Sequence, residues 1–273
     1  MTLLILGLGY SAGFVARAVQ TMAVVGITQD GRDGTIAFAD AEQVRGAIGR
    51  ATHILSSVPP GEGDPVLAAY GADIARSGAW LGYLSSTGVY GDTGGAWVDE
   101  SAPVGTGRRA ARAEADATWL DLGARVFRLP GIYGPGRSPL DRIGPRIDAP
   151  GQVFSRVHVE DIAGAVLAGL IAPPGAYNIA DDLPAPQSEV TALACQLRGL
   201  PVPPLVPLDQ AGLTPAARAF YSENRRIANG KAKRVLGWRP RYPDYRAGLR
   251  ALNAITSPTS VSAPPAAASQ VQR

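Results

Sequence analysis

The first strand and the glycine-rich turn after it constrain this chain more than any other feature. Residues 2–6 read TLLIL, a composition typical of a strand that is buried on both faces of a sheet. Gly7, Gly9 and Ala12 follow with the spacing G-x-G-x-x-[G/A]. Residues 14–19 then place their apolar side chains on one helical face. The segment predicts a buried strand, a tight turn and a helix.

This turn has the properties of a dinucleotide site. Gly7 permits the tight turn, Gly9 lets backbone approach a pyrophosphate, and a small residue at 12 lets the helix pack close to the strand. The helix start presents unpaired N–H groups and a positive dipole end to the phosphates. An ordinary tight strand-to-helix turn would also use glycines. We predict that the cofactor-binding residues here are Gly7, Gly9, Tyr10, Ser11, Ala12 and Gly13.

Composition limits the class of protein. The chain has 273 residues, of which 46% are hydrophobic and 18% charged, enough for a sizeable core. No apolar stretch is long enough to span a membrane, and no leader precedes the first strand, so we expect a cytoplasmic protein. A single cysteine, Cys195, excludes an internal disulfide framework, and its helical apolar pattern predicts a buried packing residue. We predict no metal site.

The positive charge is concentrated late in the chain. Residues 215–250 contain ten lysines and arginines against two acids, a local charge of +8. They show neither an aromatic stacking pattern nor a recognised nucleic-acid motif, which disfavours a nucleic-acid partner. A solvated face, or a seat for a diphosphate-bearing substrate, explains the charge as well, since arginine binds diphosphate through bidentate contacts. Arg225 and Arg226 are candidate substrate residues.

Residues after the second strand, 23–28, would select the form of a nicotinamide dinucleotide. An acid there accepts from the ribose 2′-OH, and a cation accommodates a 2′-phosphate. Asp30 favours NAD and Arg32 favours NADP, with Gln29 beside them. All three would also suit a solvated loop. Asp40, which follows a short strand at 35–38, completes this part of the predicted site.

Strand and helix patterns alternate through the first half of the chain. Strands are predicted at 52–58, 80–84 and 125–129, and helices at 41–48, 64–77 and 108–122. This alternation predicts an α/β fold, a Rossmann-type doubly wound parallel sheet. We expect residues 1–150 to form the NAD(P)-binding domain and residues 151–256 a smaller substrate lobe with elements that return to the sheet. Residues 257–273 are rich in Ser, Pro and Ala and predict a disordered tail.

Shorter elements are predicted in the second half. Strand patterns occur at 156–159 and 176–179, and a proline-rich connector at 201–207. Helical patterns occur at 161–170, 187–198, 231–236 and 245–254.

Four stretches together resemble one superfamily. They are the opening glycine turn, SSTGVYG at 85–91, RLPGIYGPG at 128–136 and VHVEDI at 157–162. The chain resembles the extended and atypical short-chain dehydrogenases/reductases of the NAD-dependent epimerase/dehydratase superfamily, over residues 1 to about 255. The resemblance implies NAD(P), a small or nucleotide-sugar substrate, and a monomer or homodimer. It favours NADP, because the family often has a basic residue at the position of Gln29.

The resemblance also implies site residues. Ser86 occupies the position of the family's catalytic Ser or Thr, with Thr87 beside it, and its hydroxyl would hydrogen-bond the reacting oxygen. Both hydroxyls would equally suit the cap of a strand end. The implied cofactor contacts are Ser56, Ser57, Val58, Pro59, Ser85, Pro130, Gly131 and Ile132, and Tyr133 is a candidate substrate contact.

One departure from the family pattern concerns its catalytic base. The family uses a Tyr with a Lys four residues later, but those positions hold Thr106 and Ala110. No tyrosine lies between Tyr90 and Tyr133, and no lysine precedes residue 231, so a shifted alignment does not restore the pair. A threonine hydroxyl is too weak an acid to replace a tyrosine whose pKa is near 10.

Three functions remain open at this point. The first is an enzyme with a relocated proton donor, for which Tyr90 beside Arg108, Arg109 or Arg112 is our candidate. The second is a cofactor-binding sensor or regulator without hydride chemistry. The third, which we rank last, is a nucleic-acid-binding module. The sequence does not identify the substrate or the direction of reaction.

Overall fold

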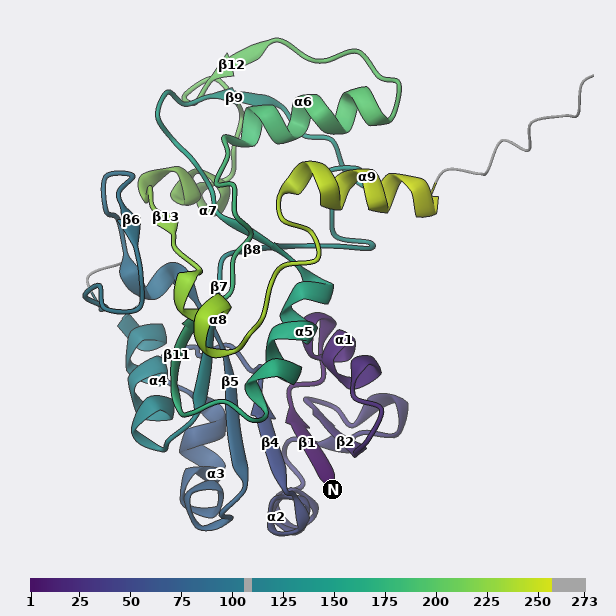
Figure 1. Cartoon of the computed structure of the whole chain (residues 1–273), viewed down its shortest axis with the longest axis vertical. Coiled ribbons are helices and arrows are strands. Elements are labelled where there is room, and N and C mark those ends of the chain that lie inside the picture. The colour runs from purple at the N-terminus through teal and green to yellow at the C-terminus, as the bar shows by residue number, and fades with distance from the viewer. Residues whose placement is uncertain (106–109, 257–273) are drawn as a thin grey trace, which may run out of the picture.

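The computed structural model describes residues 1–105 and 110–256, and a seven-stranded parallel sheet forms its centre (Figure 1). The order of the strands across the sheet is β11 (Gly175–Asn178), β7 (Arg125–Leu129), β5 (Trp80–Ser86), β4 (His53–Ser56), β1 (Thr2–Leu6), β2 (Ala23–Thr28) and β3 (Ile36–Ala37). Strand order reverses beside β1, so a crevice opens there at the carboxyl ends of the strands.

Strand β1 shows why the opening segment is apolar throughout. It pairs with β2 on one side and with β4 on the other, and Leu3, Leu4, Ile5 and Leu6 are fully buried. Leu3 and Ile5 pack into the core on one face of the sheet, whereas Leu4 and Leu6 pack into the core on the opposite face. A central parallel strand covered on both faces has no polar side.

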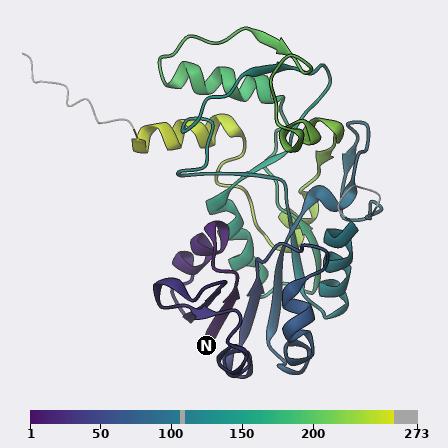
Figure 2. The ribbon, with the colours of Figure 1, turned by 180° about the vertical axis from the view of Figure 1, so that it is seen from behind.

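Helices cover both faces of the sheet (Figures 1 and 2). One face carries α2 (Ala41–Arg50), α3 (Pro65–Arg76) and α4 (Ala110–Asp121), whose apolar side chains share a core with Leu4 and Leu6. The other face carries α1 (Tyr10–Ala18) and α5 (Val159–Gly169), which pack on Leu3 and Ile5. The predicted α/β doubly wound fold is confirmed.

A smaller lobe lies beyond the carboxyl ends of the strands, at the top of Figure 1. Its core contains Tyr133, Leu140, Val190 and Leu249. The helices outside the sheet layers are α6 (Gln187–Leu197), α7 (Pro215–Ala219) and α9 (Tyr245–Thr256), whereas α8 (Gly230–Val235) packs beside β11 through Ala232. The short pairs of parallel strands are β8 (Gly131–Tyr133) with β10 (Arg156–His158), β9 (Arg146–Asp148) with β12 (Leu205–Pro207), and β6 (Trp97–Val98) with β13 (Arg226–Ile227).

The lobe is not one continuous stretch of sequence. Strand β9, before residue 151, belongs to it, whereas α5 and β11 return to the main sheet. Strands of two or three residues, such as β6, β9 and β13, are too short to give a period-2 pattern, so the sequence did not predict them. The connector predicted at 201–207 ends in β12.

Several smaller expectations have definite outcomes. Cys195 is buried in α6, as predicted. Among the helices at 1–105 and 110–256, none has both the length and the apolar character needed to cross a bilayer. The tail predicted at 257–273 lies outside the described residues. Short 3₁₀ segments occur at η1 (Arg32–Gly34), η2 (Thr87–Tyr90) and η3 (Phe220–Ser222).

Candidate functional site

The glycine turn has the geometry that its sequence predicts. Gly7 has φ 85°, and a Cβ there would lie 2.7 Å from the Val58 Cγ2 atom. The N–H groups of Gly7 and Leu8 both donate to the carbonyl of Ile27, at 3.0 and 2.9 Å. Only glycine combines this left-handed conformation with so close an approach of the loop after β4.

The start of α1 leaves amide hydrogens available to a ligand. Its N-cap residue, Gly9, provides no side-chain acceptor, and the N–H groups of Tyr10, Ser11 and Ala12 have no acceptor among the residues that the structure describes. A Cβ added at Gly9 would find nothing nearer than the Gly7 carbonyl oxygen at 3.9 Å. No bulky side chain therefore fills the approach, and the turn fits a diphosphate.

A cavity of about 920 Å³, here called the turn cavity, opens over this turn. It runs from the end of β2, past the glycine turn, to the loops after β4, β5 and β7, a span and volume that suit a dinucleotide. Its lining is Gly7, Leu8, Gly9, Tyr10, Ser11, Ile27, Thr28, Gln29, Arg32, Phe38, Ser57, Val58, Pro59, Pro65, Leu84, Ser85, Ser86, Arg112, Leu129, Pro130, Gly131, Ile132, Arg137 and Phe220.

Some of the residues predicted to select the cofactor at the end of β2 line the turn cavity, and others do not. Gln29 and Arg32 line the turn cavity, but Asp30 does not. The Asp30 carboxylate lies 3.9 Å from the Arg32 guanidinium, and both side chains are exposed. Asp40 is a correction to the predicted site. It caps α2 by accepting from the N–H of Gln43, because its place before the helix turns its carboxylate toward the first turn.

Three other predicted cofactor residues lie off the cavity lining. Ser56 is fully buried, and its hydroxyl has no partner among the described residues, whereas the next residue, Ser57, lines the cavity and donates to the Gly7 carbonyl. Ala12 packs into the core of the sheet, as the close approach of helix to strand requires. Gly13 lies inside α1 and donates its N–H to the Gly9 carbonyl.

A second cavity of about 750 Å³, here called the lobe cavity, lies between the sheet and the smaller lobe. It adjoins the turn cavity along residues that line both: Ser86, Leu129, Pro130, Gly131, Ile132, Arg137 and Phe220. Tyr133, Arg225 and Thr87 line the lobe cavity alone. A ligand in one cavity would therefore meet a ligand in the other beside the ends of β5 and β7.

Ser86 stands at this junction. It is the last residue of β5, and its hydroxyl oxygen accepts from the Gly88 N–H at 3.1 Å. This bond leaves the hydroxyl proton for another acceptor. Ser85 lines the turn cavity only and donates to the Asp116 carboxylate at 2.6 Å.

We compared the sequence and the structure with those of known proteins. No family model matches the sequence. A solved structure described as a functionally unknown conserved protein from Silicibacter pomeroyi DSS is 45% identical, with a TM-score of 0.85 over 93% of this chain and 98% of that one. The human epimerase family protein SDR39U1, solved with NADPH, has a TM-score of 0.74 at 15% identity and covers 93% of this chain and 99% of its own.

The chain has the structural fold of the NAD-dependent epimerase/dehydratase superfamily of short-chain dehydrogenases/reductases. Among curated relatives, the 3-diazoavenalumate denitrifying reductase of a Streptomyces species is 29% identical over 178 residues, which is 56% of this chain and 58% of that enzyme. The match thus spans little more than half of the reductase, and its activity belongs to that protein.

Tyr90 does not take the position that we expected of a relocated proton donor. It is 2% exposed and lines neither cavity. Its hydroxyl donates to Asn178 Oδ1 at 2.8 Å and accepts from Arg128 Nη1 at 2.9 Å. The 3₁₀ turn after β5 carries the ring inward, and burial raises the pKa of Tyr90 although Arg128 opposes the rise. This placement corrects the expectation.

The cation beside Tyr90 is likewise not one that we expected. Arg128 is buried and makes two hydrogen bonds to the Asp116 carboxylate, at 2.7 and 3.1 Å. Arg112, on α4, lines the turn cavity instead, and it makes no ion pair within the described part of the chain. Ala110 begins α4. Thr106, Arg108 and Arg109 lie outside the described residues.

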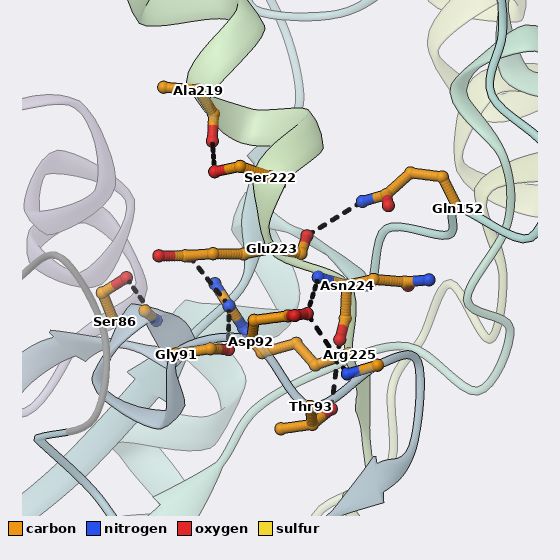
Figure 3. Close-up of polar contacts among 12 residues, drawn as sticks. Ser86, Gly91, Asp92, Thr93, Gln152, Ala219, Ser222, Glu223, Asn224 and Arg225 are labelled. Carbon is orange, nitrogen blue, oxygen red and sulfur yellow. Dashed lines mark hydrogen bonds and ion pairs between the residues drawn. The ribbon is translucent and has the colours of Figure 1, made fainter.

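Arg225 and Arg226 point to different places, although they are adjacent. Arg225 lines the lobe cavity, where its Nη1 lies 2.9 Å from Glu223 Oε2 and donates to the Gly91 carbonyl (Figure 3). Arg226 belongs to β13, and its guanidinium donates to the Gly95 carbonyl. Of these two arginines Arg225 lines the lobe cavity and Arg226 does not, and a contact of Arg225 with substrate stays a prediction.

The segment that carries Arg225 ties the lobe to the loop after β5. The Asn224 N–H donates to Asp92 Oδ1 at 2.7 Å, and the Asn224 carbonyl accepts from the N–H of Thr93 at 3.1 Å (Figure 3). Gln152 donates to the Glu223 carbonyl at 2.9 Å. These bonds fix Glu223 and Arg225 at the edge of the cavity.

Sequence reasoning missed some charged residues of the lobe cavity. Arg156 is 7% exposed and donates to the carbonyls of Phe154 and Ala185 and to Gln187 Oε1. Arg137, Arg142 and Glu223 also line the cavity. Arg137 follows directly after one of the recognised motifs and could have been found there. Nothing in the sequence around Arg156 distinguishes it from a surface arginine.

Proposed function

We propose that this protein is an NAD(P)-dependent oxidoreductase or epimerase/dehydratase-like enzyme that works without the Tyr-x-x-x-Lys pair. The observation that carries the proposal is the junction of the two cavities at Ser86 and residues 130–132. The cofactor would supply hydride transfer, and the protein would bind and orient both reactants. We expect it to act in the cytoplasm, as a monomer or homodimer.

The chain's own groups would divide the work between the cavities. The free amides at the start of α1 would hold the diphosphate. The Ser86 hydroxyl would donate to the reacting oxygen of the substrate, because its own oxygen already accepts from Gly88. Pro130, Gly131 and Ile132 would flank the nicotinamide and separate it from water.

We propose NADP as the preferred cofactor. Arg32 and Gln29 line the end of the turn cavity that would receive the adenosine ribose, whereas Asp30 is not among the lining residues and its carboxylate lies 3.9 Å from the Arg32 guanidinium. A guanidinium at this point accommodates a 2′-phosphate, and a carboxylate that is off the lining accepts nothing from a 2′-hydroxyl.

We propose a small anionic or nucleotide-sugar substrate. Among the described lining of the lobe cavity, Arg137, Arg142, Arg156 and Arg225 outnumber the acids Asp141 and Glu223. An excess of arginine in a confined cavity favours carboxylate or phosphate groups. Tyr133 would form part of the wall, where its ring is 5% exposed.

A non-catalytic NAD(P)-binding sensor or regulator is the second candidate. The placement of Tyr90 favours it, because a buried tyrosine that bonds Asn178 and Arg128 is not free to exchange a proton with a substrate. Such a protein would bind the cofactor and show no turnover with any substrate.

The test is a cofactor titration followed by a turnover screen. We expect the purified protein to bind NADPH more tightly than NADH, as measured by calorimetry, and to change NADPH absorbance when carbonyl compounds or nucleotide sugars are added. Failure of every dinucleotide to bind would reject both candidates. Binding with no turnover across the screen would favour the regulator.

Substitution of Ser86 separates catalysis from binding. We expect Ser86→Ala to lower kcat by about 100-fold, the usual cost of losing one donor to a reacting oxygen, while the Kd for NADPH is unchanged. Ser101→Ala, at an exposed serine that lines neither cavity, is the matched control. Full turnover in Ser86→Ala would remove Ser86 from the catalytic machinery.

A further inference from the structure

The turn at residues 134–137 packs directly on the first residue of α1. Gly134 and Arg137 exchange backbone hydrogen bonds of 3.2 and 3.0 Å, which closes the turn after β8. A Cβ at Gly134 would lie 2.5 Å from Val159 Cγ1 and 2.7 Å from the Tyr10 hydroxyl. Glycine is therefore needed at 134 for the turn to sit against Tyr10.

Tyr10 fastens this turn beside the glycine turn at the start of α1. Its hydroxyl donates to the Pro135 carbonyl at 3.0 Å, and the Arg137 guanidinium lies 5.5 Å from the centre of its ring. Tyr10 is the residue directly after the N-cap Gly9. The contact thus holds Arg137 close to the free amides of the helix start.

Arg137 has no counter-ion in the described part of the chain. The nearby Asp141 carboxylate instead accepts from the N–H and the hydroxyl of Ser138, at 2.8 and 3.0 Å. Arg137 is exposed and lines both the turn cavity and the lobe cavity. An unpaired guanidinium at the edge of a cavity suits an anionic ligand, and its planar fork suits phosphate oxygens.

We propose that Arg137 binds the diphosphate of the dinucleotide, from the side of the turn cavity that faces the amides of α1. This inference rests on the proposed function, since it needs a dinucleotide in the turn cavity. The phosphates would then contact the sheet domain through the glycine turn and the loop after β8 through Arg137. The cofactor would thereby connect the glycine turn with the loop after β8, which Tyr10 already connects through its hydrogen bond to Pro135.

Binding of ADP and adenosine to Arg137→Ala tests the assignment, because the two ligands differ by the diphosphate. We expect the variant to lose about 10- to 100-fold in affinity for ADP and for NADPH, the usual cost of losing hydrogen bonds to a charged group. Affinity for adenosine, measured by competition, should be unchanged. Arg137→Lys, which keeps the charge and loses the fork, should lose less than Arg137→Ala.

Arg142→Ala is the matched control, because Arg142 lines the lobe cavity alone. It should bind ADP as the unchanged protein does. The Tm of Arg137→Ala should fall only slightly, since the variant loses the contact with the Tyr10 ring and no described side-chain hydrogen bond.

The outcomes separate this inference from the proposed function. Failure of the unchanged protein to bind ADP and NADPH would overturn both. Normal binding of ADP by Arg137→Ala would overturn the inference and leave the proposed function standing. An equal loss for ADP and adenosine would also overturn it, because the variant would then have damaged the cavity as a whole.

Discussion

A side chain introduced at Gly9 should interfere with ligand binding and leave folding unaffected. Its φ of −101° is open to any residue, and a Cβ there would meet no protein atom closer than 3.9 Å. Gly7 differs, because its φ is positive and a Cβ would lie 2.7 Å from Val58 Cγ2. The two glycines therefore serve the ligand and the fold, respectively.

We expect Gly9→Val to keep its Tm and to lose about 100-fold or more in affinity for NADPH, because the branched side chain would occupy the phosphate approach. Calorimetry and thermal unfolding measure the two quantities. Gly7→Ala should instead lower the Tm, because its positive φ and its close approach to Val58 leave no room for a Cβ. Normal NADPH affinity in Gly9→Val would contradict the site.

Tyr90 allows a second prediction at the residue scale. Tyr90→Phe leaves Arg128 Nη1 and Asn178 Oδ1 without this partner inside the protein, so we expect a loss of about 1–3 kcal/mol in the free energy of unfolding. Urea denaturation measures it. Tyr221→Phe is the control, since no hydrogen bond of its hydroxyl is found within the described chain. Unchanged stability with abolished turnover would instead restore Tyr90 as a proton donor.

At the scale of elements, Asp64 links two helices on one face of the sheet. Its Oδ1 caps α3 by accepting from the N–H of Val66 and Leu67, at 2.8 and 3.1 Å. Its Oδ2 accepts from the indole N–H of Trp119 on α4, at 2.8 Å. The sequence Asp-Pro predicts the cap, whereas the bond to α4 comes from tertiary packing.

We expect Asp64→Ala to lower the free energy of unfolding by about 2–4 kcal/mol, because a cap and a buried hydrogen bond are lost together. Asp40→Ala, which removes the cap of α2, should cost only about 1 kcal/mol. Chemical denaturation of both variants makes the comparison. Equal losses would mean that the Trp119 bond adds nothing.

At the scale of the whole molecule, Asp181 makes stability depend on pH. It lies directly after the short stretch that follows β11, is 2% exposed, and its Oδ2 has no partner among the described residues. Burial raises the pKa of Asp181 to about 8, against the opposing charge of Arg156. A carboxyl whose pKa is raised on folding stabilises the folded state at low pH, and that contribution is lost as pH rises through the folded pKa.

We therefore compare the free energy of unfolding of the wild-type protein with that of Asp181→Asn at pH 5 and at pH 8.5. Between these two pH values the wild-type protein should become less stable than the variant by about 1–3 kcal/mol. Using the difference between the two proteins cancels the other titrating groups, among them Asp161, whose pKa burial raises to about 6. Urea denaturation at both pH values measures it. A difference that does not change with pH would show that Asp181 is ionised throughout.

The cofactor half of the site could be predicted better than the catalytic half. Glycine spacing determines backbone conformation directly, and Gly7, Gly9, Tyr10 and Ser11 line the turn cavity, while their contact with a cofactor stays a prediction. Side-chain direction is less readable, because successive residues at a strand end point to opposite sides. Ser56 was predicted at the cavity beside Ser57 for this reason, and it is buried instead.

The sequence alone determined the first strand, the turn and the doubly wound α/β class of the fold, because local spacing and the alternation of strand and helix patterns dictate them. It also showed that the Tyr-x-x-x-Lys pair is missing. Tertiary structure alone decided that Tyr90 turns inward to Arg128 and that Arg137 reaches the start of α1, 127 residues away in the chain. Contacts between distant segments depend on the conformation of the loops above the sheet, and local sequence patterns do not predict that conformation.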